Sequence, residues 1–198
     1  VMADRMLDDL LAAAPDSPAK RVLAAWDRKA DADSQGAVLF EALMAGFRPE
    51  WKVAANPADP LRTPMGLQNA DAGVAALAKA AAEVEKKYGK LDVAYGQVHR
   101  LRYRGADWPG NGADGALGAF RVLRYGPNGP VHGDTFVACV EWEKQGPRAQ
   151  VLVSYGNSSQ PGTKHDVDQV PLLSEKKLRP AWRLRKDVEA NLESRENF

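Results

Sequence analysis

The hydrophobic periodicity of the sequence changes near residue 96, and this change limits the folds that the chain can form. Before residue 96 the chain is rich in alanine, and its apolar residues recur every three or four positions, as in amphipathic helices. After residue 96, short runs of β-branched and aromatic residues alternate with turn residues, as in antiparallel strands. We therefore predict an α+β fold, with a helical first half and antiparallel strands in the second half.

Four helices are predicted in the first half: Asp4–Ala14, a helix opened by Ser17-Pro18, a helix that begins at Ser34, and Asp71–Tyr88. Serine is a favoured N-cap, and proline is well tolerated at the first helical position, so the start of the second helix is clearly marked. Gly89 is expected to end the fourth helix as a C-cap. The intervening segment Pro49–Pro64 is interrupted by prolines and is predicted to lack regular structure.

Four strands are predicted in the second half: Val98–Tyr103, Ala119–Tyr125, Thr135–Trp142 and Gln150–Tyr155. Turn residues at 126–130 and 144–147 indicate antiparallel neighbours. Two short helices are expected after the strands, at Ser174–Leu178 and Lys186–Glu193. These elements divide the chain into a helical segment (1–96), a segment of antiparallel strands (97–160), and a polar loop with a carboxyl-terminal helix (161–198).

The composition excludes some classes of partner. The 198 residues carry a net charge of +1, from 27 basic and 26 acidic side chains, so no global field attracts nucleic acid or an anionic membrane. No apolar run approaches the roughly 20 residues that span a bilayer, and no signal peptide is present. Cys139 is the single cysteine and has no partner for a disulfide within the chain. We predict no nucleic-acid partner and no membrane partner.

The segment Val151–Gln169 is the most informative part of the sequence for function. A strand that ends at Tyr155 runs into Gly156-Asn157-Ser158-Ser159, and a variable loop then leads to His165-x-x-Asp168-Gln169. This order resembles the carboxyl end of the penicillin amidase family, and within it most of all the acyl-homoserine lactone and aculeacin A acylases.

Further blocks in the same order support this resemblance, and together they cover most of residues 23–180. They are residues 23–27 (LAAWD), 33–40 (DSQGAVLF), 95–100 (YGQVHR), 112–121 (GADGALGAFR) and 133–136 (GDTF). Two positions depart from the usual pattern. Tyr95 stands where tryptophan is usual, and Asn157 stands where glutamine is common.

The resemblance implies the carboxyl-terminal part of the β subunit of an N-terminal-nucleophile hydrolase with an αββα sandwich, of which residues 1–198 form part of one larger catalytic domain. Such enzymes are cut from a precursor, and the exposed amino-terminal serine attacks an amide carbonyl with its own α-amino group as base. Val1 has no hydroxyl or thiol, and an internal serine has no free α-amine. We therefore predict no catalytic residue on this chain.

The same resemblance implies the partners and the location of the chain. The upstream α and β segments of the precursor are the expected protein partners, and an N-acyl small molecule is the expected substrate. A calcium ion is expected in the upstream part, with no cofactor on this chain. A periplasmic or secreted location is implied.

A few polar residues are candidates for a functional role. Asp134 is the best of them, because an acidic group at the start of a strand in a matched block could orient an upstream arginine near the active site; the alternative is that it caps a turn. His99, His132 and His165 lack the short spacing of metal ligands, so no metal site is assigned. His165, Asp166, Asp168 and Gln169 are instead predicted to tie a loop by hydrogen bonds.

Two other motifs have structural interpretations. Ser158 does not form a nucleophile elbow, because Gln160 replaces the second glycine of G-x-S-x-G, so turn chemistry is predicted there. The basic segment 176–186 contains Trp182 and could contact a nucleic-acid backbone. We favour a solvated strand instead, because Arg183 and Arg185 alternate with apolar residues, as on a half-buried edge strand, and acidic residues balance them.

Two hypotheses from different classes follow. The first is a segment of an acylase that hydrolyses acyl-homoserine lactones, lipopeptides or β-lactams, with an aliphatic acyl group as the first choice. The second is a stand-alone α+β binding or interaction domain without catalytic activity.

Overall fold

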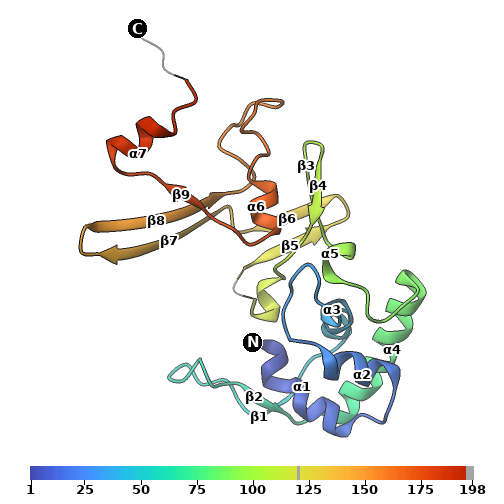
Figure 1. Cartoon of the computed structure of the whole chain (residues 1–198). Coiled ribbons are helices and arrows are strands. Elements are labelled where there is room, and N and C mark those ends of the chain that lie inside the picture. Colours follow the sequence, from blue (N-terminus) through green and yellow to red (C-terminus); the bar gives the residue numbers. More distant parts are fainter. Residues whose placement is uncertain (120, 195–198) are drawn as a thin grey trace. The chain divides into compact units, whose positions relative to one another are not determined.

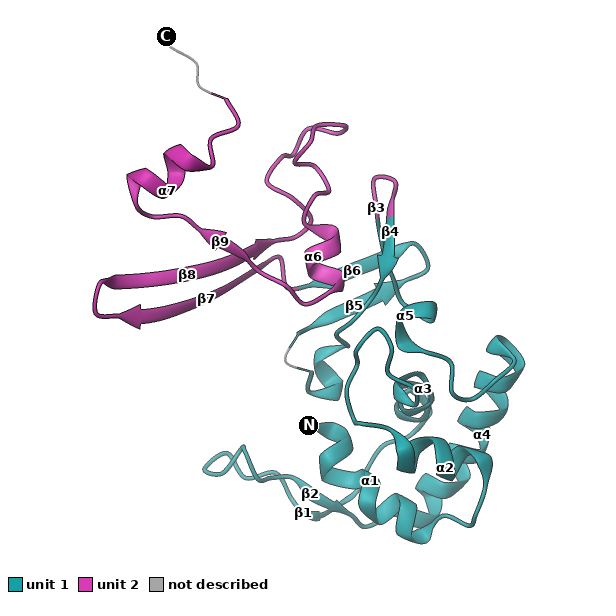
Figure 2. Ribbon diagram, in the orientation of Figure 1, with its two compact units in different colours: residues 1–102, 107–133 teal, residues 103–106, 134–198 magenta. Residues whose placement is uncertain are grey.

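The computed structural model describes residues 1–119 and 121–194, and it contains both helices and antiparallel strands (Figure 1). The α+β prediction is confirmed. The chain forms two compact units (Figure 2): unit 1 comprises residues 1–102 and 107–133, and unit 2 comprises residues 103–106 and 134–198. No helix among the described residues is both long and apolar enough to cross a membrane.

Unit 1 is built mainly from helices. They are α1 (Met2–Ala13), α2 (Pro18–Ala25), α3 (Ala37–Gly46), α4 (Ala70–Tyr88) and the short α5 (Tyr95–Val98), followed by the 3₁₀ turn η1 (Gly115–Leu117). The predicted cap of α2 is confirmed, because the Ser17 hydroxyl accepts a hydrogen bond from the Lys20 amide at 3.2 Å. The predicted C-cap of α4 is also confirmed, with Gly89 in the left-handed conformation at φ 76°.

Two predicted helix starts are wrong. α1 begins at Met2, so Asp4 lies in its first turn and not at its N-cap. α3 begins at Ala37, three residues after Ser34, because Gly36 occupies the N-cap with φ 111°. A Cβ at Gly36 would lie 2.6 Å from the Cβ of Trp26, so packing as well as backbone conformation requires glycine there.

The prediction that the segment Pro49–Pro64 lacks regular structure is wrong in part. It contains β1 (Trp51–Val53), which pairs antiparallel with β2 (Met65–Leu67). Tertiary contacts hold this pair: the Asp9 carboxylate on α1 accepts hydrogen bonds from Lys52 Nζ at 2.8 Å and from the Leu67 amide at 2.7 Å. Such long-range partners are not visible in the local pattern that predicted a loop.

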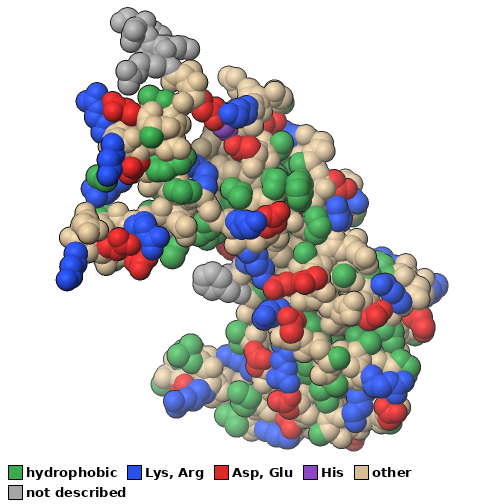
Figure 3. All heavy atoms as spheres, viewed as in Figure 1, with side chains coloured by type: hydrophobic (Ala, Val, Ile, Leu, Met, Phe, Trp, Pro, Cys, Tyr) green, Lys and Arg blue, Asp and Glu red, His purple; other side chains and the backbone are tan. Residues whose placement is uncertain are grey.

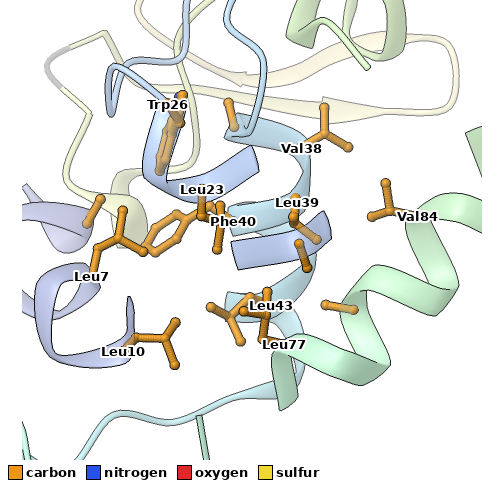
Figure 4. Close-up of a cluster of buried hydrophobic side chains, with 14 of the residues drawn as sticks. Leu7, Leu10, Leu23, Trp26, Val38, Leu39, Phe40, Leu43, Leu77 and Val84 are labelled. Carbon is orange, nitrogen blue, oxygen red and sulfur yellow. The ribbon is translucent and has the colours of Figure 1, made fainter. Parts of the chain in front are cut away.

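The main hydrophobic core lies among the helices of unit 1 (Figure 4). Leu7 and Leu10 of α1, Leu39 and Leu43 of α3, and Leu77 of α4 are each no more than 3% exposed. Among the described residues, 26 apolar side chains are buried, and 23 of them belong to unit 1. This unit therefore has a core of its own.

Four short strands complete unit 1, although the turn between the first two belongs to unit 2. They are β3 (Arg100–Tyr103), β4 (Ala106–Pro109), β5 (Leu123–Gly126) and β6 (Gly129–Gly133). The predicted strand Val98–Tyr103 starts later, because Val98 ends α5. The predicted strand Ala119–Tyr125 is observed as β5, shifted toward its turn; Phe120 lies outside the described residues. β6 was not predicted, because its two glycines and Pro130 conceal it.

Unit 2 is built around a three-stranded antiparallel sheet in the order β7 (Phe136–Glu143), β8 (Gly146–Val153), β9 (Arg179–Ala181). The turn predicted at 144–147 is confirmed. β8 begins at Gly146, four residues before the predicted start, and it ends at Val153, two residues before the predicted end. It continues in register to Glu143↔Gly146, next to the turn.

Two helices follow the β7–β8 hairpin, and both differ from the prediction. α6 occupies Val170–Ser174, not Ser174–Leu178, because Pro171 starts the helix and residues 179–181 form β9. α7 is Arg185–Ala190. The edge strand predicted around Arg183 and Arg185 is wrong: β9 ends at Ala181, and Trp182 and Leu184 are exposed.

The register of the β7–β8 hairpin separates apolar from charged side chains. Side chains that face each other across an antiparallel pair lie on the same face of the sheet. One face therefore carries Phe136, Ala138, Val140 and Trp142 of β7 opposite Val153, Val151, Ala149 and Pro147 of β8. We call these eight residues the apolar face.

The opposite face of the hairpin is polar at its far end, where Arg148 forms ion pairs with Glu141 and Glu143. Acidic and basic side chains are also interspersed over the visible surface of the molecule (Figure 3), in line with the near balance of 27 basic and 26 acidic residues.

Candidate functional site

The loop that follows β8, residues 154–169 in unit 2, contains the motif that points to a function. It connects the end of β8 to α6, and its two ends are joined by hydrogen bonds of Gln169. The Gln169 side-chain carbonyl accepts from the Val153 amide at 2.9 Å, and its side-chain amide donates to Asn157 Oδ1 at 3.1 Å. The Gln169 backbone amide donates to the Tyr155 carbonyl at 3.0 Å. Gln169 is only 2% exposed, so it closes the base of the loop from within.

A buried carboxylate fixes the middle of this loop. Asp166 is 4% exposed, and its Oδ1 accepts a hydrogen bond from Arg104 Nη1 at 2.5 Å. Its Oδ2 accepts from the Gly162 amide at 3.1 Å. Arg104 Nη1 also donates to the Ser159 carbonyl at 3.2 Å. A buried charge needs a partner of opposite sign, and Arg104 supplies it from the turn between β3 and β4.

Aromatic stacking adds a second contact between the same two segments. The rings of Tyr103 and Tyr155 stack with centroids 4.4 Å apart and planes 22° apart. The Arg104 guanidinium lies 5.0 Å from the centroid of the Tyr103 ring. Burial raises the pKa of the Tyr155 hydroxyl above its ordinary value, and the neighbouring Tyr103 contributes to the same shift.

The glycine of the motif is required by close packing of two backbone segments. A Cβ at Gly156 would lie 2.2 Å from the carbonyl oxygen of His165. The next turn of the loop is held by the Ser158 amide, which donates to that same carbonyl at 2.9 Å. The Ser158 hydroxyl accepts from the Gln160 amide at 3.1 Å. The predicted turn chemistry of Ser158 is thereby confirmed.

His165 joins the loop to the segment after α7. Its Nδ1 lies 2.6 Å from Asp168 Oδ2, and its Nε2 lies 2.9 Å from Glu193 Oε2. Lys164 Nζ also contacts Glu193, at 2.7 Å. Together with Asp166 and Gln169, these contacts confirm the predicted loop-tying cluster.

The charges around His165 shift two pKa values in opposite directions. Hydrogen bonds to Asp168 and then Glu193 raise the pKa of His165 above 6.5. Hydrogen bonds from Lys164 and then His165 lower the pKa of Glu193 below 4.5. The stabilisation of the folded state that comes from Glu193 is present above pH 4.5 and is lost as the pH falls further. The stabilisation that comes from His165 is present below pH 6.5 and is lost as the pH rises. Both stabilising effects are therefore complete between pH 4.5 and pH 6.5.

We therefore expect the segment after α7 to be held most firmly between pH 4.5 and 6.5. In the full-length protein, trypsin cleavage after Arg185 should be roughly twofold slower at pH 6 than at pH 9, because exposed ion pairs have modest effects. The cleavage rate is normalised at each pH to that of an unstructured peptide. His165→Gln should remove the difference; a difference that persists in this variant would contradict the assignment to His165.

Asp134 lies two residues before β7, in the connection from β6, and is partly buried. Its backbone carbonyl accepts a hydrogen bond from the Ser154 hydroxyl at 3.4 Å. Within unit 2, Asp134 is therefore close to Ser154, the first residue of the loop 154–169. The role predicted for its carboxylate, orienting an arginine from another segment, stays a prediction.

A second polar cluster lies in unit 1. His99 Nε2 is 2.6 Å from Glu41 Oε2, and the His99 ring packs between Tyr95 and Tyr125, with centroids 4.3 and 4.7 Å away. The Tyr125 hydroxyl donates to the Asn111 carbonyl at 2.6 Å. Tyr95 is 1% exposed, and its hydroxyl has no hydrogen-bond partner among the described residues. Burial, with Glu41 nearby, raises the pKa of Tyr95.

Metal binding has no visible basis in the described part of the chain. Within residues 1–119 and 121–194, no three His, Cys, Asp or Glu side chains are arranged to hold a metal ion. His132, on β6, faces Arg124 across the strand pair. The two carboxylates that contact His165 lie on different ring nitrogens, which suits hydrogen bonding and not chelation.

The sequence did not identify Arg104 and Tyr103 as part of the loop structure. They lie about 50 residues before the loop, and their sequence indicated only the end of a strand. The candidate site is consequently a loop that Gln169 closes at its base and Arg104 anchors at its middle.

Comparisons with known proteins agree with the motif in this loop. The model of the penicillin amidase family matches residues 1–190. The chain is 32% identical over 174 residues to an acyl-homoserine lactone acylase, PvdQ, of Pseudomonas savastanoi pv. phaseolicola, which covers 81% of this chain. It is 35% identical over 170 residues to the PvdQ acylase of Pseudomonas putida, with 79% coverage. It is 29% identical over 185 residues to the aculeacin-A acylase of Actinoplanes utahensis, with 89% coverage.

These relatives are much longer than this chain, which spans 22% of the length of each. A solved structure of penicillin G acylase from Alcaligenes faecalis aligns with 97% of this chain and 44% of its own, at 13% identity and a TM-score of 0.41. The match of the family model across nearly the whole chain is sufficient for assignment, and the chain belongs to the penicillin amidase family.

Proposed function

We propose that this chain is one segment of an acylase that hydrolyses the amide bond of N-acyl compounds. The observation that carries the proposal is the match of the penicillin amidase family model over residues 1–190, together with relatives that are named as acylases. In this proposal the nucleophile is an amino-terminal serine on another segment, with its α-amino group as the base. The oxyanion hole, made by a backbone N–H and an asparagine, also lies outside residues 1–198.

The proposal gives this chain a supporting role. Its sheet and its anchored loop contribute to the scaffold around the upstream nucleophile, within an αββα sandwich. Asp134 would orient an upstream arginine near the reacting groups. A calcium ion would belong to the upstream part, and the enzyme would work in the periplasm or outside the cell after cleavage of its precursor.

An aliphatic acyl group is our first choice of substrate, on the basis of the GNSSQP and ADGALG motifs and of relatives named acyl-homoserine lactone acylases. The full-length processed protein should hydrolyse decanoyl-homoserine lactone faster than penicillin G. Replacement of its amino-terminal serine by alanine is the control and should abolish hydrolysis. Asp134→Asn should lower the rate without changing the thermal midpoint. Preference for penicillin G would reverse the substrate choice, and hydrolysis of neither compound would contradict the proposal.

The alternative is a stand-alone α+β binding or interaction domain, and unit 1 is the observation in its favour because it has a core of its own. Intact-mass analysis of native material separates the two. A complex of two chains, of which the one that contains residues 1–198 is longer and begins with serine, supports the acylase segment. A single folded and monodisperse species of 21.5 kDa would support the stand-alone domain.

A further inference from the structure

We propose that the apolar face of the β7–β8 hairpin is the surface on which an upstream segment of the same full-length protein docks. The inference rests on the proposed function, because it requires that residues 1–198 work as one segment of a longer protein. It adds the surface and the chemistry of the partner: an apolar, strand-bearing surface outside residues 1–198. Four observations support it.

The apolar face has the composition of a core, yet its four β7 residues are exposed and its four β8 residues are only partly buried. Phe136 is 60% exposed, Val140 49% and Trp142 81%. An antiparallel sheet commonly turns a polar face to water and packs its apolar face. In this hairpin, Glu141, Glu143 and Arg148 make the far end of the other face polar, whereas Leu152 at its near end is fully buried. The exposed part of the apolar face is therefore the apolar surface of the hairpin that still lacks cover.

Unit 2 has too few buried residues to form a core. Of the 26 buried apolar residues among those described, only Leu152, Val170 and Leu173 belong to unit 2. None of the three is part of the apolar face. Units of about 60–70 residues rarely gain enough stability from their own burial, and three buried side chains supply far less than such a unit requires.

The free edge of β7 also lacks a partner. Among the described residues, β7 pairs with β8 and with no other strand. Its residues 136–140, FVACV, contain none of the proline or charged residues that natural edge strands use to prevent pairing, and the two charges of β7, Glu141 and Glu143, lie at its far end. An uncovered apolar face next to an unprotected edge indicates a partner that both packs against the sheet and extends it.

The length of the relatives identifies where the partner lies. This chain spans 22% of the length of each named acylase, so most of a full-length relative lies outside residues 1–198. A segment of the same protein is present at equal amount and at high local concentration during folding. We therefore assign the cover to it, and not to a second copy of this chain or to an unrelated protein.

The test uses one charge placed on either face of the same sheet. Val140→Glu puts a carboxylate on the apolar face, and Gln150→Glu, its matched control, puts one on the opposite face at an exposed position. In the full-length protein, Val140→Glu should lower the soluble yield roughly tenfold or more, because the charge is buried at the interface. Gln150→Glu should leave the yield unchanged.

In residues 1–198 expressed alone, the effect of Val140→Glu on the soluble yield should have the opposite sign. Val140→Glu should raise the soluble fraction, because it breaks an exposed apolar patch, and Gln150→Glu should raise it less. Val140→Ser provides a milder variant if the glutamate prevents folding of the full-length protein, and it should lower the thermal midpoint. Cysteine labelling of Val140→Cys, in a Cys139→Ser background, should be at least tenfold slower in the folded full-length protein than in the lone chain.

Three results would overturn the assignment. Equal effects of Val140→Glu and Gln150→Glu in the full-length protein would show that the face is not covered. Destabilisation of the lone chain by Val140→Glu would show that the cover lies within residues 1–198. A defined dimer of the lone chain that persists in the full-length protein would identify a second copy as the partner. Amide hydrolysis is measured on the same samples, so an inactive protein with a protected face would contradict only the proposed function.

Discussion

Residues 1–198 expressed without the rest of the protein are expected to be recovered mainly as aggregates, or as a species with molten unit 2. The apolar face exposes Phe136, Val140 and Trp142, and burial of each such side chain is worth about 1.5–3 kcal/mol when complete. That stabilisation is absent in the lone chain, and the unprotected β7 edge adds a route to aggregation. The measurement is the soluble fraction, followed by binding of a hydrophobic dye and thermal unfolding of the soluble part.

The same chain released from a cleaved precursor provides the control, because it should stay soluble and docked. Helical signal from unit 1 should persist in the lone chain, since that unit has its own core. A sharp cooperative melt of the lone chain without dye binding would show that residues 1–198 form a self-sufficient domain.

Arg104→Ala is expected to release the loop of residues 154–169, and this is the largest effect on stability that we expect from one substitution in residues 1–198. The change leaves Asp166 buried and charged without its partner, which costs about 3 kcal/mol, the lower end of the range for buried pairs, because Arg104 is itself partly exposed. In the full-length protein, hydrogen exchange of the Ser158 and Gln169 amides should accelerate about a hundredfold, since both donate to carbonyls of this loop.

Arg148→Ala is the matched control for this prediction. Arg148 pairs with two carboxylates, Glu141 and Glu143, but its side chain is 62% exposed. Its loss should change the free energy of unfolding by less than about 1 kcal/mol and leave exchange in the loop unchanged. Combining Arg104→Ala with Asp166→Asn should recover part of the stability that Arg104→Ala removes, because the double variant no longer has an unpaired buried charge. Equal exchange rates in wild type and Arg104→Ala would contradict the role of the ion pair.

Local signals predicted those elements whose start and end depend on nearby residues. The cap at Ser17, the terminal Gly89 and the turn at 144–147 each act within a few residues, and the structure confirms all three. The loop-tying role of His165, Asp166, Asp168 and Gln169 was also predicted, because their spacing allows contacts within one loop and does not match that of metal ligands.

Elements that depend on distant partners were missed. β1 is held through its pairing with β2 and through Asp9, and β6 is a strand only because β5 lies beside it. The anchor at Arg104 has the same cause: nothing near residue 104 indicates a carboxylate 62 residues later. The two strands that carry the apolar face were predicted from their own residues, whereas the segment that we propose as its cover is not part of residues 1–198.

The β3–β4 turn has a consequence for dissecting this protein into fragments. Residues 103–106 belong to unit 2, although the chain on either side of them belongs to unit 1. No single cut of the backbone therefore separates the two units. A fragment that begins at Asp134 would lack both Arg104 and Tyr103, so Asp166 would lose its counter-charge and Tyr155 its stacking partner. Grafting or swapping unit 2 between relatives would require the hairpin tip to be transferred with it.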